Sequence, residues 1–243
     1  MKSIKEKIKT IPVLGRITMK FYKLLYPNLK LDYLIQSYLS DEKSTIIQIG
    51  SNDGKTGDPI YHLLQKNKKW KAIMVEPVPY LFNRLKKNYL EDPRFIFENV
   101  AINDGKIQTF YAIKPEAKDK LEDLPPWYDQ LGSFYKLNIT KHLNGRLEPF
   151  IEEIKLQGIT LNNLFLKHSI TSIGLLHIDT EGYDWKILSQ LNLNNYKPTL
   201  ILYEQKHLSE VERKESIKFI IKQIVIIEIE VLEEYLRYIP KEY

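Results

Sequence analysis

Short apolar runs alternate along the chain with stretches of helical spacing. Thr45–Ile49 and Lys71–Val75 are such runs, and apolar residues then recur every three or four positions from about Asp58 to Lys68 and from Pro79 to Tyr89. Strands that alternate with helices in this way are typical of parallel sheets joined by crossover helices. The pattern therefore predicts an α/β fold.

The same alternation returns in the second half of the chain. Gly174–Ile178 and Thr199–Tyr203 are almost continuously apolar, as strands buried on both faces of a parallel sheet are. Helices are expected from about Asp184 to Gln190 and from Ser209 to Lys222, and a last strand over Ile224–Val231. We expect a mostly parallel, doubly wound sheet of Rossmann-like type.

An insertion interrupts this pattern over about residues 106–172. A third strand is expected over Arg94–Ala101, and Asn103-Asp104-Gly105 is a hairpin signal before an alternating run at Lys106–Ile113. Residues 114–172 contain prolines, acids and aromatics.

Within this insertion we expect one strand around Phe150–Leu156 and a short helix that begins near Thr160. No repeat or low-complexity linker divides the chain. The insertion is therefore interpreted as a lid on a single domain over residues 41–243.

Residues 1–40 are predicted to form a helical extension. Isoleucines and leucines recur there between lysines, which predicts a basic amphipathic helix interrupted near Pro12. Residues 1–30 carry a net charge of +7, whereas the remainder has 28 basic and 30 acidic residues. We favour a helix packed on the domain edge, and peripheral membrane contact through residues 1–25 is the open alternative.

Composition excludes several classes of function. The chain is 43% hydrophobic, enough for a core, and its lack of cysteine excludes disulfides, thiolate nucleophiles and cysteine-ligated zinc. Since the positive charge is confined to the N-terminal residues, the body lacks a basic patch and nucleic acid is not an expected partner. No apolar run has the length of a signal peptide or membrane span, so we expect a cytoplasmic protein.

Five polar or glycine-rich groups follow the expected strands. They are Gly50–Gly54, Glu76, Asn99–Ala101, Asp179–Gly182 and Glu204–His207. Ligands of open parallel sheets bind outside the carboxyl ends of the strands, so these groups are expected to share one rim. The glycines of the first group permit close approach of a ligand, Glu76 lies where such folds hold two ribose hydroxyls, and Asn99 is a candidate contact for an adenine edge.

The densest polar group is His177 to Gly182. His177, Asp179 and Glu181 could bind a metal, but their short spacing does not form a closed structural site. We favour the alternative in which His177 is a buried core histidine and the acids cap the helix that begins near Asp184. No metal is therefore predicted.

An ordered series of short motifs runs from about residue 45 to residue 208. It comprises Ile47–Gly54, Val75-Glu76-Pro77, Asn99-Val100-Ala101, Gly132-Ser133, Thr160-Leu161, His177–Gly182 and Leu202-Tyr203-Glu204. This series resembles the FkbM-type methyltransferases. The strongest part is the Ile-Asp-x-Glu-Gly block, which follows a Gly-x-Asn-x-Gly loop and a Glu-Pro step.

The resemblance implies a Rossmann-like class I methyltransferase fold that binds S-adenosylmethionine. The implied cofactor contacts are Gly50, Asn52, Asp53, Gly54, Glu76, Asn99 and Ala101, with Asp179 facing the methionine end. The resemblance also implies O-methylation of a sugar or natural product, so the expected partner is a small-molecule or glycan acceptor.

Glu204 and His207 are candidates for the group that removes the acceptor's proton. Methyl transfer to a hydroxyl needs in-line alignment and the disposal of one proton. His207 is preferred because the ordinary pKa of histidine, about 6.5, lies near working pH. Together with Asp179, Glu204 and His207 are the catalytic candidates.

Two other functions stay open at this stage. The first is a catalytically silent cofactor-binding module, and the second is a dinucleotide oxidoreductase, which the absence of a G-x-G-x-x-G spacing disfavours. Residues 223–243 contain no Gly, Asn or Asp for the turn of a closing strand pair, so a helix over Leu232–Arg237 is the alternative there.

Overall fold

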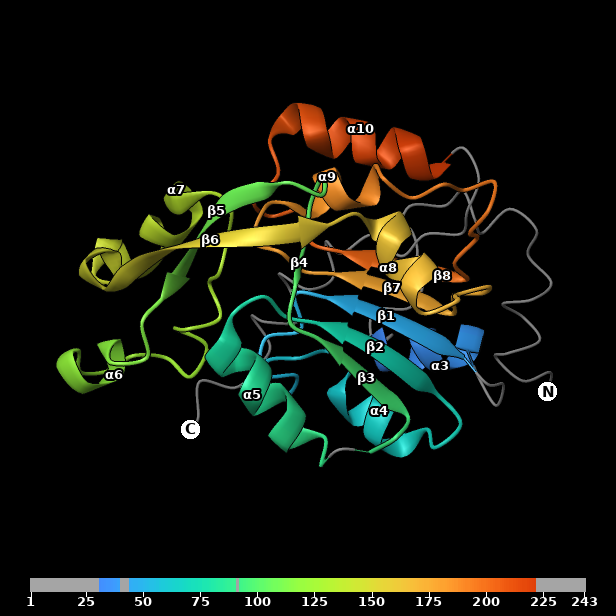
Figure 1. Cartoon of the computed structure of the whole chain (residues 1–243), viewed down its shortest axis with the longest axis horizontal. Helices are drawn as coiled ribbons and strands as arrows, with labels where there is room; N and C mark the ends of the chain where they lie inside the picture. The colour runs from blue at the N-terminus through green and yellow to red at the C-terminus, as the bar shows by residue number, and fades with distance from the viewer. Residues whose placement is uncertain (1–30, 40–43, 91, 222–243) are drawn as a thin grey trace, which may run out of the picture.

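A five-stranded parallel sheet forms the centre of the protein, as a computed structural model of residues 31–39, 44–90 and 92–221 shows (Figure 1). The strands run in the order β3 (Phe95–Glu98), β2 (Lys71–Val75), β1 (Thr45–Ile49), β7 (Leu175–Ile178) and β8 (Leu200–Tyr203), and every neighbouring pair is parallel. This is the Rossmann-like α/β sheet that the sequence predicts. The order reverses between β1 and β7, where such sheets bind their ligands.

Helices cover both faces of this sheet (Figure 1). One face is covered by α3 (Leu31–Leu39), α4 (Tyr61–Lys66) and α5 (Pro79–Asn88), and the other by α8 (Leu161–Lys167), α9 (Asp184–Leu188) and α10 (Glu210–Ile221). Alternate residues of β1 point into the two cores: Ile46 packs with Leu34 and Leu63, and Ile47 packs with Leu164 and Ile187. Burial on both faces explains why the central strands are nearly continuous apolar runs.

A second, three-stranded sheet extends away from the centre (Figure 1). It consists of β4 (Ala101–Ile102), β6 (Ile151–Ile159) and β5 (Ile107–Ile113) in that order, and β5 is antiparallel to β6. Between β5 and β6 lie the short helices α6 (Ala117–Lys120), α7 (Lys136–Thr140), η2 (His142–Gly145) and η3 (Glu148–Phe150). They pack around a small core of their own that includes Leu131 and Ile139.

Two expectations for this region are wrong. The predicted strand Arg94–Ala101 ends at Glu98, and Ala101 belongs to the second sheet. The predicted hairpin at Asn103-Asp104-Gly105 joins strands that do not pair, because β6 lies between them. Asn103 holds the turn instead: its Oδ1 accepts from the Gly105 N–H at 2.7 Å, and its side chain packs where a Cβ on Gly158 of β6 would be.

One helix of the predicted insertion packs on the central sheet. Helix α8 falls within the stretch 106–172, yet its Leu161, Leu164 and Phe165 pack on the central sheet. The expected helix of residues 1–25 and the expected elements after residue 222 lie outside the described residues. Among the described helices, none has the length and apolar character needed to cross a membrane.

The loop after β1 rests on α5. The Tyr89 hydroxyl donates to the Gly54 carbonyl at 3.1 Å, and the Asn88 amide donates to the Asp53 carbonyl at 2.8 Å. Gly54 has φ +67°, and a Cβ there would lie 2.3 Å from the Leu85 side chain. Gly57 has φ +72° and open space around it. The two glycines therefore share a backbone requirement, but only Gly54 is needed for packing.

We expect Gly54→Ala to lower the free energy of unfolding by about 1–3 kcal/mol more than Gly57→Ala, because only Gly54→Ala overpacks α5. Both variants place a side chain on a residue with positive φ, which destabilises the protein by about 1 kcal/mol. Urea unfolding followed by circular dichroism measures the difference. Equal losses would mean that α5 moves aside at little cost.

Candidate functional site

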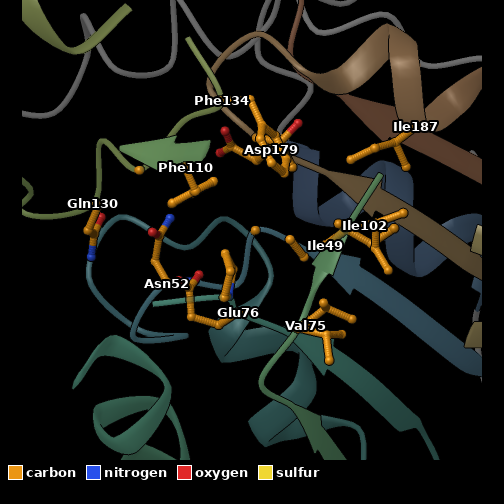
Figure 2. Close-up of a pocket in the computed structure, with 16 residues that line it drawn as sticks. Ile49, Asn52, Val75, Glu76, Ile102, Phe110, Gln130, Phe134, Asp179 and Ile187 are labelled. Atoms are coloured by element: carbon orange, nitrogen blue, oxygen red, sulfur yellow. The ribbon is translucent and has the colours of Figure 1, made fainter. Parts of the chain in front are cut away.

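A cavity lies at the carboxyl edge of the central sheet, at the reversal of strand order (Figure 2). Of the predicted cofactor contacts, five line it: Gly50, Asn52, Glu76, Ala101 and Asp179. They come from the ends of β1, β2 and β7 and from β4, which are separated in sequence. The expectation that strand-end residues share one rim is therefore confirmed for these residues.

Gly50 brings the ends of β1 and β7 into contact. Its φ is +81°, and a Cβ on it would lie 1.7 Å from the carbonyl oxygen of Asp179. The Asp179 N–H in turn donates to the Ile49 carbonyl at 2.9 Å, which continues the β1–β7 ladder to the edge of the cavity. Only glycine fits here, because any side chain would push the two strand ends apart.

Glu76 is the buried acid of the cavity. Its residue is 2% exposed, and its two carboxylate oxygens accept from the Asn52 and Val78 N–H groups, each at 2.8 Å. Burial raises the pKa of this carboxyl to about 7, and Asp129 and Asp53 add to the shift. Each oxygen keeps a lone pair free for another donor. The side chain is thus fixed in place with acceptor capacity left over (Figure 2).

Three predicted contacts do not line the cavity. Asp53 accepts from the Lys55 and Thr56 N–H groups at 3.0 and 2.7 Å and closes the turn of the loop. Gly54 packs on α5. Asn99 is exposed, and its amide donates to the Glu76 carbonyl at 2.8 Å. These residues hold the frame of the site around the cavity.

The insertion supplies a wall that the sequence did not reveal. Phe110, Gln130, Gly132 and Phe134 line the cavity opposite the sheet, and the Phe110 and Phe134 rings meet edge to face at 5.1 Å (Figure 2). The space that remains is about 30 Å³.

Arg84 ties the insertion to the loop after β1. From α5, its guanidinium donates to Asp53 Oδ2 at 2.8 Å and to Asp129 Oδ2 at 2.5 Å. Both carboxylate side chains are 4% exposed. Because one guanidinium serves two buried acids, the loop and the insertion are held in one arrangement.

Acids and imidazoles gather beside the cavity. Asp179, Glu181 and Glu204 form one close set, and Glu181 forms a second with His142 and His207. The distance from His207 Nε2 to Glu181 Oε2 is 3.1 Å, and to Glu204 Oε1 it is 3.9 Å. Burial and then the neighbouring Asp179 raise the pKa of Glu204 to about 10. The three catalytic candidates, Asp179, Glu204 and His207, are thus brought together.

His142 was not predicted, and Glu181 was considered only as a metal ligand or a helix cap. Glu181 belongs to the Asp-x-Glu-Gly block, so its place in a motif was the available signal, whereas His142 lies in an insertion without periodic pattern. Glu181 has φ +51°, and its carbonyl accepts from Ser133 Oγ at 2.9 Å and from the Asn138 amide at 2.7 Å. Contacts with the insertion therefore hold Glu181 in this backbone conformation.

His177 is a buried core histidine, as the sequence interpretation has it. Its residue is 2% exposed, and burial lowers its pKa to about 4. The acid that holds the loop before α9 is Asp184, rather than Asp179 or Glu181. Its Oδ2 accepts from Thr180 Oγ1 at 2.9 Å and its Oδ1 from the Glu204 N–H at 3.2 Å. Asp179 and Glu181 are consequently left without this capping role.

A wider groove adjoins the cluster on its outer side. Its volume is about 860 Å³, within the usual range of small-molecule sites. Tyr135, His142, Lys206, His207 and Glu212 contribute to its lining. The cluster lies between cavity and groove, because Asp179 lines the cavity, Glu181 lies within both sets, and His142 and His207 line the groove.

These features define a class of protein: a Rossmann-like sheet with a glycine turn after β1 and a buried acid after β2 is typical of proteins that bind a nucleoside-containing cofactor. The family model described as "Methyltransferase FkbM domain" matches residues 48–237. The chain belongs to this family and is a methyltransferase, as its motifs imply. No curated protein and no solved structure gives a significant match.

We expect Asp184→Ala to lower the free energy of unfolding by about 2–4 kcal/mol, because it leaves buried N–H and hydroxyl groups without acceptors. Lys186→Ala, on the exposed side of the same helix, is the matched control and should change it by under about 0.5 kcal/mol. Urea unfolding of both variants measures this. Similar stability of the two would show that water replaces the carboxylate.

Proposed function

We propose that the protein is an S-adenosylmethionine-dependent O-methyltransferase that acts on a hydroxyl group of a sugar or natural product. The observation that carries this proposal is the Glu76 carboxylate, buried in the cavity with one backbone partner for each oxygen. A fixed carboxylate with free lone pairs on both oxygens suits a ribose with two adjacent hydroxyls.

The types of residue that line the cavity suit S-adenosylmethionine. Gly50 and Asn52, at the end of β1 and in the loop after it, would border the cofactor, and Glu76 would accept hydrogen bonds from the ribose hydroxyls. Ala101 and Phe110 offer apolar surface for the base. Asp179 would face the charged methionine end. The cofactor, when bound, supplies an electrophilic methyl group on a sulfonium.

A hydroxyl acceptor is favoured by the cluster between cavity and groove. A hydroxyl must lose its proton as it is methylated, so it benefits from a nearby base. His207 has a side chain that is 8% exposed, which keeps bulk water from its ring, and Glu204 lies 3.9 Å away. The groove carries an aromatic ring at Tyr135 and polar groups at Lys206 and Glu212. Such a lining suits a polyhydroxylated acceptor.

We expect Glu76→Ala to weaken the binding of S-adenosylhomocysteine by about 1.5–3 kcal/mol, because it removes a charged hydrogen-bonding group. Titration calorimetry on the folded variant measures this. Glu98→Ala is the matched control, since Glu98 is also a buried acid that ends a strand, but it pairs with Lys167 and His168 and does not line the cavity. If both variants bind equally well, Glu76 does not contact the cofactor.

We expect His207→Ala to lower turnover by about 100-fold or more while the affinity for S-adenosylhomocysteine stays nearly unchanged. A panel of sugars and hydroxylated natural products with a labelled methyl donor provides the assay and also separates an enzyme from a silent binding module. His62→Ala, an exposed histidine paired with Asp32, is the control. Full turnover in the His207 variant would remove this residue from the reaction.

A further inference from the structure

Three carboxylates meet beside the cofactor cavity. Oxygens of Asp179, Glu181 and Glu204 lie within 4.8 Å of one another. Within residues 31–39, 44–90 and 92–221, no lysine or arginine forms an ion pair with any of the three, and the basic group beside them is His207, 3.1 Å from Glu181 and 3.9 Å from Glu204. Like charges at this separation repel strongly in a partly buried site, and one imidazole balances at most one of the three negative charges.

A buried imidazole points into the same cluster. The His207 side chain is 8% exposed, and its Nε2 has no hydrogen-bond partner in the described part of the chain. This nitrogen lies 3.1 Å from Glu181 Oε2, but the contact does not have the geometry of a hydrogen bond. Glu181 Oε2 and Glu204 Oε2 also have no hydrogen-bond partner among the described residues. Buried polar atoms are almost always paired, so three unpaired atoms in one cluster are open to a further ligand.

We propose that Asp179, Glu181 and Glu204 bind one divalent cation, with His207 beside them. A set of three carboxylates consists of hard oxygen ligands, which suits Mn²⁺ or Mg²⁺ better than the sulfur and nitrogen sites that zinc prefers. His142, whose ring lies 5.5 Å from that of His207, belongs to the separate set with Glu181 and His207. His177 takes no part, because it is buried within the sheet.

The position of this cation gives it a use, which rests on the proposed function. Asp179 borders the cofactor cavity and His207 borders the groove, so the cation would lie where an acceptor hydroxyl meets the methyl donor. A hydroxyl bound to a divalent cation loses its proton more readily. Asp179, Glu181 and Glu204 would balance the charge of the cation, and His207 would stay beside it as the proton acceptor.

Titration of the chelator-treated full chain with Mn²⁺ alone, followed by electron paramagnetic resonance of the free ion, tests the proposal. We expect about one Mn²⁺ per chain, displaced by Mg²⁺, and Glu181→Gln and Glu204→Gln should each weaken Mn²⁺ affinity by about 10–100-fold or more. Glu215→Gln, an exposed carboxylate on α10, is the matched control and should bind as the unaltered chain does. Circular dichroism without metal shows that each variant is folded.

Absence of Mn²⁺ binding at millimolar concentration would overturn the proposal, as would unchanged affinity in the two cluster variants. Binding of S-adenosylhomocysteine is measured separately with and without Mn²⁺. If the cofactor analogue binds and Mn²⁺ does not, the metal site fails while the proposed function stands. If Mn²⁺ binds and the analogue does not, the metal site stands and the proposed function fails.

Discussion

The contact between Gly50 and the Asp179 carbonyl brings the first half of the chain to the second. The β1 and β7 strands are adjacent although more than a hundred residues separate them, and their ladder runs up to this contact without a side chain between the strand ends. The cavity, the acid after β2 and the cluster after β7 and β8 all take their positions from it. A larger residue at Gly50 would displace Asp179 from the cavity and the cluster together.

The site concentrates acids where a stable fold would avoid them. Glu76, Asp179, Asp184 and Glu204 are all carboxyls whose pKa burial raises, which means that ionisation of each is unfavourable in the folded state. Such groups destabilise the protein as the pH rises above the ordinary carboxyl pKa, because the unfolded chain then releases protons that the folded chain retains. Local costs of this kind are expected at functional sites, where binding or chemistry needs the charge.

Much of the central sheet could be predicted, because strands buried on both faces must be apolar and the residues after them must lie at one edge. Gly50, Asn52, Glu76, Ala101 and Asp179 were found by this reasoning. The second sheet could not be predicted correctly, since the packing of Asn103 against Gly158 joins residues far apart in sequence.

Gln130, Phe134 and His142 gave no sequence signal for a similar reason. Their segment has short helices and irregular turns, so no period links residue type to position. Asp53 and Gly54 were assigned to the cofactor as members of the loop after β1, and Asn99 as a residue that follows the third strand. Sequence proximity does not distinguish a side chain that faces a ligand from one that faces the supporting frame.

Arg84 makes the two halves of the site thermodynamically dependent on each other. Its guanidinium serves Asp53 in the loop after β1 and Asp129 in the insertion, so a displacement of either acid changes the free energy of the other. Such coupling is reciprocal. A molecule that stabilises this arrangement of the insertion raises the affinity of the loop for its own ligand, and that ligand stabilises the same arrangement by the same factor. The element that couples the loop to the insertion is therefore an ion pair rather than a hinge.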